Sequence, residues 1–306
     1  MGKIAFLFAG QGSQYVGMGK DLYDNVESSS QVFNMGESLR KGTLSQCFEG
    51  EADELSKTEN TQPCLFLTDL ACARALYSNG INPDMIAGFS LGEISALAFS
   101  NILSDEDAFK LVTVRGEVMA QCANANPGGM VAVVKLSSEQ VDDAARKYNN
   151  VYPVNYNCPG QVAVAGDKEE LKEFSKDIKE IGGRAIRLAV SGPFHTPFMK
   201  KATDRLVLEL NNMDINKAKF PLYSNMTGDL YPEDKEEIIQ TVANQASNSV
   251  KWENIIRKMY DDGCDTFIEV GPGKTLSGFV SKTLENVNVY NVADMESLTS
   301  TLNELK

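Results

Sequence analysis

The segment around Ser90 has the residue types and spacing of a nucleophilic serine. It is Gly88-Phe89-Ser90-Leu91-Gly92, and it lies between a short apolar run and a stretch of small and apolar residues. Glycines on both sides of a serine allow a tight strand-to-helix turn, so that the hydroxyl projects into a cleft and the next N–H faces a developing oxyanion. A glycine-rich helix start without catalytic function has the same pattern, and these five residues alone favour neither interpretation.

His195 is the only histidine in the chain, and it could act as a base for such a serine. A serine hydroxyl is a weak nucleophile at neutral pH unless a base lies within hydrogen-bond distance of it. The histidine falls in the predicted loop Gly192–Pro197, and loops carry a large share of catalytic groups. Many loop histidines only bond backbone carbonyls, but the serine turn makes the role of general base the favoured hypothesis.

Arg115 lies on the apolar face of a predicted helix over Asp105–Cys122. The other residues that share this face at helical spacing are Ala108, Leu111, Val112, Val118, Met119 and Cys122. A buried guanidinium without a partner is strongly destabilising, so Arg115 must pair with an anion. That anion is either a carboxylate elsewhere in the protein or the free carboxylate of an acyl substrate, which arginine binds through two parallel hydrogen bonds.

The elements that must position Ser90 and Arg115 alternate between strands and helices. The predicted order is strand Lys3–Phe8, helix Gln62–Tyr77, strand Met85–Phe89, a short helix after Ser90 that runs to Phe99, and the helix to Cys122. The sequence Ser104-Asp105-Glu106-Asp107 has the form of a capping box at the start of that last helix. Such alternation is typical of an α/β sheet.

The polar and glycine-rich run Asn124–Gly129 interrupts this alternation and marks a predicted domain boundary. The elements that follow are strand Met130–Leu136, helix Ser138–Tyr148, strand Val151–Tyr156, strand Gln161–Ala165, helix Lys168–Ile181 and strand Arg184–Val190. Their order, β-α-β-β-α-β, is that of a ferredoxin-like fold. We therefore predict a ferredoxin-like insert over residues 125–191 within a discontinuous α/β main domain, residues 1–124 and 192–306.

The pattern of the main domain resumes after Ser191. Its predicted elements are helix Phe198–Asn211, strand Phe220–Tyr223, helices around Glu236–Gln245 and Trp252–Tyr260, and strand Thr266–Val270. The turn Gly271-Pro272-Gly273 then leads into a final predicted helix, and the C-terminal stretch is polar.

Length and composition predict a soluble protein. The 306 residues, 42% of them hydrophobic, are enough to bury a large core. The apolar run Ile4–Phe8 continues into Gly10-Gln11-Gly12 rather than into a small-residue cleavage site, so we interpret it as a buried strand and not as a signal peptide. No stretch approaches the roughly 18 uninterrupted apolar residues of a membrane span, and we expect no membrane interaction.

Charge and cysteine usage narrow the function classes further. A formal net charge of -13 without a basic arm argues against nucleic-acid binding. Six scattered cysteines without a Cys-x-x-Cys pair suggest reduced thiols in a cytoplasm, and with a single histidine they leave little to build a zinc site. An anionic partner would need a local basic patch on this acidic protein. Candidate residues for such a patch are Arg184, Arg187, Lys200 and Lys201, although for any one of them an ordinary solvated surface charge is the simpler interpretation.

Six motifs occur in order along essentially the whole chain. They are Gly10-Gln11-Gly12-Ser13-Gln14, Gly88-Phe89-Ser90-Leu91-Gly92-Glu93, Arg115-Gly116-Glu117, Asn155-Tyr156-Asn157, Gly192-Pro193-Phe194-His195 and Glu269-Val270-Gly271-Pro272-Gly273-Lys274. Taken together they resemble the malonyl-CoA:acyl-carrier-protein transacylases. The resemblance implies an α/β-hydrolase-like main subdomain with a mostly parallel sheet and an inserted ferredoxin-like subdomain, in agreement with the predicted partition.

The resemblance also implies a role for each site residue. Ser90 would be the nucleophile and His195 its base. The N–H groups of Gln11 and Leu91 would form the oxyanion hole, and Arg115 would bind the malonyl carboxylate.

Three further positions are interpreted through the same resemblance. Gln245 matches the family glutamine whose backbone carbonyl orients the histidine in place of a triad aspartate. Phe89 is a departure, because many members have histidine there, and it could change how the acyl carboxylate is solvated or which acyl group is preferred. Phe194 matches malonyl-type members, in which a bulky ring crowds an α-methyl branch. Because one methyl is worth only about 1–3 kcal/mol in a pocket, malonyl would be preferred but not exclusive.

We predict an acyltransferase that moves malonyl from malonyl-CoA to the phosphopantetheine thiol of acyl carrier protein through a Ser90 ester, for fatty-acid or polyketide synthesis. We expect a cytoplasmic monomer that needs no metal and no cofactor beyond its coenzyme A thioester substrate. A serine hydrolase is a second function class, disfavoured by Arg115 and by the missing triad acid. A non-catalytic module that docks carrier proteins is a third, disfavoured because Ser90 and His195 are both present.

Overall fold

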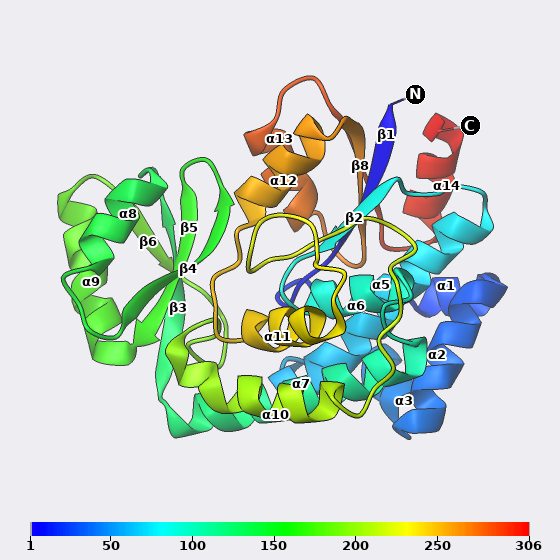
Figure 1. The fold of residues 1–306 in the computed structure, drawn as a ribbon, viewed down its shortest axis with the longest axis horizontal. Coiled ribbons are helices and arrows are strands. Elements are labelled where there is room, and N and C mark those ends of the chain that lie inside the picture. Colours follow the sequence, from blue (N-terminus) through cyan, green and yellow to red (C-terminus); the bar gives the residue numbers. More distant parts are fainter. Residues whose placement is uncertain (1, 306) are drawn as a thin grey trace.

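The computed structural model describes residues 2–305, and its strands form two separate sheets (Figure 1). Sheet A has five strands in the order β7-β2-β1-β8-β9, with every neighbouring pair parallel. Its strands are β1 (Lys3–Phe8), β2 (Met85–Gly88), β7 (Leu222–Tyr223), β8 (Cys264–Val270) and β9 (Asn288–Val292). The predicted α/β class with a mostly parallel main sheet is confirmed.

Side chains of β1 alternate between two apolar cores, one on each face of sheet A. Ile4, Phe6 and Phe8 join the larger core, whereas Ala5 and Leu7 join the smaller one. An extended backbone imposes this two-residue alternation on a strand that is buried on both faces. The larger core contains residues of α5 (Thr58–Ser78), α6 (Leu91–Phe99) and α7 (Asp105–Ala125), and the smaller one contains residues of α12 (Trp252–Asp261) and α13 (Thr275–Thr283) (Figure 1).

The start of α7 agrees with the prediction made from its capping residues. The hydroxyl of Ser104 accepts the N–H of Asp107 at 3.0 Å, which satisfies one of the free N–H groups of the first helical turn. The helix continues to Ala125, slightly beyond the predicted end at Cys122. Arg115 is among the buried residues of this helix, as the spacing of its apolar residues predicted.

Sheet B has four antiparallel strands in the order β4-β5-β3-β6. Its strands are β3 (Gly128–Val134), β4 (Val151–Cys158), β5 (Gln161–Asp167) and β6 (Arg184–Arg187), and its helices are α8 (Ser138–Ala145) and α9 (Lys168–Glu180). The elements follow one another in the ferredoxin-like order predicted for the insert, although β6 ends at Arg187 rather than at Val190. The domain boundaries at residues 125 and 191 stay a prediction.

The two faces of sheet B have different partners. Val131 and Val133 of β3 pack in a core shared with α8 and α9. Met130 and Ala132, which alternate with them, face a cavity beside the main sheet, and Met130 also belongs to the larger core. Sheet B therefore supplies one wall of that cavity.

The remaining α-helices are α1 (Lys20–Asn25), α2 (Glu27–Leu39), α3 (Thr43–Phe48), α4 (Ala52–Leu55), α10 (Lys200–Leu210), α11 (Lys235–Gln245) and α14 (Met295–Leu305). Among them, α10 and α11 agree with the predicted helices Phe198–Asn211 and Glu236–Gln245, whereas α1 to α4 and α14 were not predicted. The prediction that the helix after Gly271-Pro272-Gly273 is the last element was wrong, because β9 and α14 follow it. As an edge strand, β9 is only partly buried and lacks the continuous apolar run that identifies central strands. No helix within residues 2–305 has both the length and the apolar character needed to cross a membrane.

Candidate active site

A cavity of about 260 Å³ lies between the carboxyl ends of the parallel strands and sheet B. Gln11 and Ser90 enter it from the segments that follow β1 and β2, and Arg115 enters it from α7. His195 enters from the loop after β6, and Met130 from β3. Ligands of open α/β sheets bind at this end of the strands. The structure thus brings together residues from five separate parts of the chain.

The turn that carries Ser90 depends on close backbone contacts at both flanking glycines. A Cβ at Gly92 would lie 2.3 Å from the carbonyl oxygen of Phe8, and one at Gly88 would lie 2.0 Å from the carbonyl carbon of Gly92. Ser90 itself has φ 53° and ψ -104°, a backbone conformation that residues with a side chain rarely adopt. Its N–H donates to Asn225 Oδ1 at 2.7 Å, and this bond helps to hold the turn.

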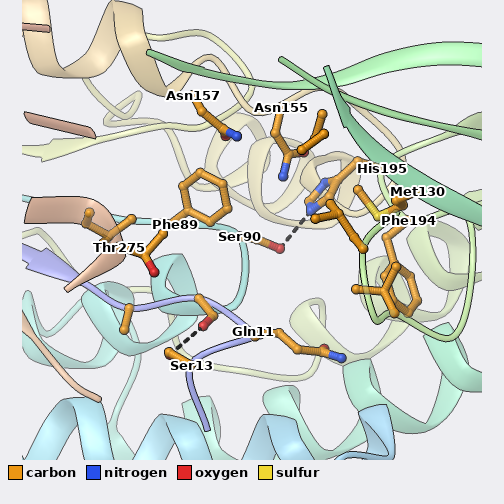
Figure 2. Close-up of a pocket in the computed structure, with 18 of the residues that line it drawn as sticks. Gln11, Ser13, Phe89, Ser90, Met130, Asn155, Asn157, Phe194, His195 and Thr275 are labelled. Atoms are coloured by element: carbon orange, nitrogen blue, oxygen red, sulfur yellow. Dashed lines mark hydrogen bonds between the residues drawn. The ribbon is translucent and has the colours of Figure 1, made fainter. Parts of the chain in front are cut away.

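Ser90 and His195 form a hydrogen bond of 2.7 Å between Oγ and Nε2 (Figure 2). On the other side of the ring, Nδ1 lies 3.0 Å from the carbonyl oxygen of Gln245 and 3.1 Å from that of Asn248. Carbonyl oxygens only accept hydrogen bonds, so Nδ1 must carry the hydrogen of the neutral ring. Nε2 is then unprotonated and accepts the hydrogen of the Ser90 hydroxyl, which is the arrangement of a nucleophile with its base.

The environment keeps His195 neutral. Burial lowers the pKa of this imidazole, the nearby guanidinium of Arg115 lowers it further, and the two carbonyl hydrogen bonds oppose the shift only in part. The resulting pKa is about 4, against an ordinary value of 6.5. At neutral pH the ring is therefore free to take up a proton.

Arg115 is 1% exposed and is held by neutral groups rather than by an acid. Its Nη1 donates to Gln62 Oε1 at 2.8 Å, and its Nη2 donates to Gln245 Oε1 at 2.9 Å and to Ser90 Oγ at 3.2 Å. Burial lowers its pKa to about 10, an effect that Glu93 opposes, so the guanidinium stays charged at neutral pH. Within residues 2–305 no carboxylate forms an ion pair with it. The sequence allowed two anionic partners for this cation, a protein carboxylate or a substrate carboxylate. In the described residues the protein carboxylate is not found.

Glu93 is a buried acid that the sequence-based analysis did not assign. Its Oε2 accepts the N–H of Asn225 at 3.0 Å and the Nε2 of Gln245 at 3.3 Å, and its Oε1 accepts the hydroxyl of Tyr231. Burial raises the pKa of this carboxyl to about 7, although these hydrogen bonds and Arg115 favour the charged form. An acid in the otherwise small and apolar helix α6 is the signal by which it could have been found.

The two predicted oxyanion-hole groups lie where they could receive a hydrogen-bond acceptor. Gln11 lines the cavity below Ser90 in Figure 2, and its side chain is held by a 3.1 Å bond to Thr58 Oγ1. Leu91 is the first residue of α6, so its N–H has no partner within the helix. In the described part of the chain neither backbone N–H meets an acceptor.

Two aromatic residues stand on opposite sides of Ser90 (Figure 2). Phe89 packs edge-to-face against Trp252, with ring centroids 5.2 Å apart. Phe194 is 6% exposed and lines the cavity beside Met130. Both predicted selectivity residues therefore form cavity walls.

The strand β4 adds two polar side chains that face the same cavity. Asn155 and Asn157 are 8% and 6% exposed, and both line the cavity (Figure 2). Within residues 2–305 no donor reaches the Oδ1 atom of either side chain. Buried carbonyl oxygens without a partner are unusual, and here they are available to a ligand with N–H groups.

Comparison with known proteins gives one consistent result. A family profile described as the acyl transferase domain matches residues 5–301. The chain is 41% identical to the malonyl CoA-acyl carrier protein transacylase of Bacillus subtilis, over 100% of this chain and 98% of that protein. It superposes on the crystal structure of a malonyl CoA-acyl carrier protein transacylase from Clostridium perfringens with a TM-score of 0.95 at 45% identity, covering 99% and 97% of the two chains.

A third similar protein was solved together with a partner. It is a malonyl-transacylase in complex with its type II polyketide synthase acyl-carrier protein, and it superposes with a TM-score of 0.94 at 31% identity over 99% of each chain. The similarity in all three cases extends over both sheets rather than over one segment.

Proposed function

The chain belongs to the acyl transferase domain family, among its malonyl-CoA:acyl-carrier-protein transacylases, and on that premise we propose that it transfers malonyl through an ester on Ser90. It is an acyltransferase. The donor is malonyl-CoA, and the acceptor is the phosphopantetheine thiol of an acyl carrier protein. The observation that carries the proposal is the 2.7 Å bond between Ser90 and His195 beside an arginine that has no acidic partner in the described chain.

In the first half-reaction the Ser90 hydroxyl attacks the thioester carbonyl of malonyl-CoA. His195 Nε2 takes the hydroxyl proton as the new C–O bond forms, and the carbonyl oxygen becomes an oxyanion. The free N–H groups of Gln11 and Leu91 are suited to bind that oxyanion. When the C–S bond breaks, the protonated His195 returns its proton to the sulfur, and coenzyme A leaves as a thiol.

The second half-reaction runs through the same groups in reverse. His195 removes the proton of the pantetheine thiol, and the sulfur attacks the carbonyl of the Ser90 ester. The oxyanion collapses with loss of the serine oxygen, which takes the proton back from the histidine. The two carbonyl oxygens at Nδ1 take the positioning role that an aspartate has in a Ser-His-Asp triad. They accept the Nδ1 hydrogen both when the ring is neutral and when Nε2 is protonated.

Arg115 is proposed to bind the free carboxylate of the malonyl group. Its guanidinium is charged, buried and held in place by Gln62 and Gln245, and it lies 3.2 Å from Ser90 Oγ. A carboxylate two carbons from the ester would meet this cation, whereas an acetyl group has nothing to offer it. The same charge favours the developing alkoxide of Ser90.

The pantetheine arm common to both thioesters carries two amide groups. We propose that its N–H groups bond the unpaired Oδ1 atoms of Asn155 and Asn157, which line the cavity. The exposed Arg184 and Arg187 on β6 remain candidates for phosphate or carrier-protein contacts. Lys200 is also exposed, but its ammonium pairs with Asp204 at 2.6 Å.

We further propose that the enzyme works as a monomer in the cytoplasm. Every group used in the two half-reactions belongs to a single chain, so a monomer suffices, and the cycle needs no metal or further cofactor. All six cysteines are free and buried, as suits a reducing cytoplasm.

Intact-mass spectrometry after incubation with malonyl-CoA tests the proposal. The wild type should gain the mass of one malonyl group, and Ser90→Ala should gain none. Arg115→Ala should lose much more of its malonyl transfer than of its acetyl transfer, measured as kcat/KM with the two coenzyme A thioesters, and equal losses would remove Arg115 from the carboxylate role. A malonyl adduct on Ser90→Ala, or release of malonate to water faster than transfer to a thiol, would contradict the mechanism.

A further inference from the structure

Resting on the proposed function, we infer that Glu93 is a positioning residue for the substrate carboxylate. It fixes the carboxamide of Gln245 in the one orientation that turns Oε1 toward Arg115. Neither Glu93 nor Gln245 lines the cavity, so both act through Arg115 and not by touching the substrate.

The carboxamide of Gln245 has a different type of partner at each end. Its Nε2 donates to the carbonyl oxygen of Ser90 at 2.6 Å and to Glu93 Oε2 at 3.3 Å. Its Oε1 accepts from Arg115 Nη2 at 2.9 Å. A reversed amide would place its N–H groups against the N–H groups of the guanidinium, and its oxygen against two acceptors. Because the residue is 1% exposed, no water relieves that conflict.

Gln245 in turn sets the direction of the guanidinium. Arg115 is held by two carboxamide oxygens, Gln62 Oε1 on Nη1 and Gln245 Oε1 on Nη2. The guanidinium is planar with its donors in a fixed fork, so these two bonds determine which N–H groups remain for a carboxylate. The Nη2 atom held by Gln245 is also the one that reaches Ser90 Oγ, where the acyl group is attached.

Glu93 is well placed to hold this amide, because its own position is fixed from outside the helix. The Asn225 N–H binds Oε2 and the Tyr231 hydroxyl binds Oε1, and both donors come from the segment after β7. Without the carboxylate, the second N–H of Gln245 would be buried with no acceptor. A carboxylate is also a stronger acceptor than the Ser90 carbonyl that would remain.

The role of Glu93 as an acceptor can be separated from its negative charge. In Glu93→Gln the amide oxygen can replace Oε2 and keep both N–H donors, while the new NH₂ group donates to the Tyr231 hydroxyl, which can also accept. Glu93→Gln should therefore keep the malonyl-to-acetyl ratio of kcat/KM found in the wild type. Glu93→Ala removes the acceptor and should lower that ratio by about tenfold or more, the size expected for losing a hydrogen bond that involves a charged group.

Two further variants complete the test. Asp69→Asn is the matched control, because Asp69 is a fully buried carboxyl that contacts Ser95 and not Gln245, and the ratio should stay unchanged. Glu93→Met is the second variant, because it removes the acceptor while a flexible side chain of similar size fills the space, and the ratio should fall as in Glu93→Ala. It decides the question if Glu93→Ala does not fold by circular dichroism.

Each outcome has a definite meaning. Equal loss of the ratio in Glu93→Gln and Glu93→Ala would show that the charge matters and would overturn the orienting role. An unchanged ratio in folded Glu93→Ala or in folded Glu93→Met would overturn it as well. A wild type that forms no malonyl ester would overturn the proposed function itself, whereas the variant outcomes in an active wild type overturn this inference alone.

Discussion

Ser90 and His195 contact each other across 105 residues of sequence, and both hold a positive backbone φ, 53° and 61°. A residue with a side chain in such a conformation costs about 1–3 kcal/mol, and such residues concentrate at functional sites. Here the strained backbone at each residue presents its side chain to the other. The strained geometry is therefore part of how the proposed nucleophile meets its proposed base.

Replacing Ser90 by glycine should relieve this strain. Ser90→Gly and Ser90→Ala both remove the hydroxyl, but only alanine keeps a Cβ at φ 53°. We expect Ser90→Gly to be more stable than Ser90→Ala by about 1 kcal/mol, measured by urea unfolding. The matched pair Ser175→Gly and Ser175→Ala, within helix α9, should show the reverse order, because glycine disfavours helices. Equal stabilities at position 90 would argue against strain there.

The acid limb of the pH–rate profile should lie well below neutrality. The pKa of His195 is lowered to about 4 by burial and by Arg115, so the base stays unprotonated across most of the acidic range. We expect kcat/KM, which reports the free enzyme, to reach half its plateau near pH 4. Acetyl-CoA serves as the control substrate because it has no free carboxylate to titrate. A midpoint near the ordinary histidine value of 6.5 would contradict the observed environment.

Glu93 should make the folded state less stable as the pH rises. Its pKa is raised from 4.5 to about 7 by burial, so the folded state holds a proton that the unfolded state has lost in this range. Its contribution to stability is complete below pH 4.5 and disappears as the pH passes about 7. The free energy of unfolding of the wild type minus that of Glu93→Gln should fall over this interval. A difference that does not change with pH would contradict this sign.

His195 should make the folded state less stable as the pH falls. Its pKa is lowered from 6.5 to about 4, so acidification protonates the unfolded state first. Its contribution is complete above pH 6.5 and is lost as the pH falls through about 4. The stability difference between wild type and His195→Asn, which tolerates a positive φ, should shrink on acidification in urea titrations. The stability difference between wild type and variant should therefore fall with rising pH for Glu93 and increase with rising pH for His195. The same sign for both would contradict the two pKa shifts.

Shortening Phe194 should widen the acyl pocket. The ring is 6% exposed and forms a cavity wall next to Met130, so Phe194→Ala would leave room for an α-methyl branch. We expect the ratio of methylmalonyl to malonyl kcat/KM to rise by about tenfold, within the 1–3 kcal/mol that one methyl contributes. Phe198→Ala, which removes a ring that packs on Tyr152 outside the cavity, should leave the ratio unchanged. A similar change in both variants would remove Phe194 from the selectivity role.

The sequence by itself determined what depends on short stretches of chain. The apolar alternation in Lys3–Phe8 predicted a buried strand, and the helical spacing around Arg115 predicted a guanidinium on a buried face. The flanking glycines predicted the turn at Ser90, and the ferredoxin-like order of elements was correct. Steric limits and the two periodicities act between neighbouring residues, so they can be recognised before the fold is known.

Only the tertiary structure decided which distant side chains share a hydrogen-bond network. The bond from Gln245 to Glu93 spans 152 residues and the bond from Arg115 to Gln245 spans 130, and no local pattern relates these positions. The tautomer of His195 likewise follows from two carbonyl oxygens that reach it only after folding. Such bonds form because packing of the sheets and helices excludes water and leaves each buried polar group with the few partners that surround it.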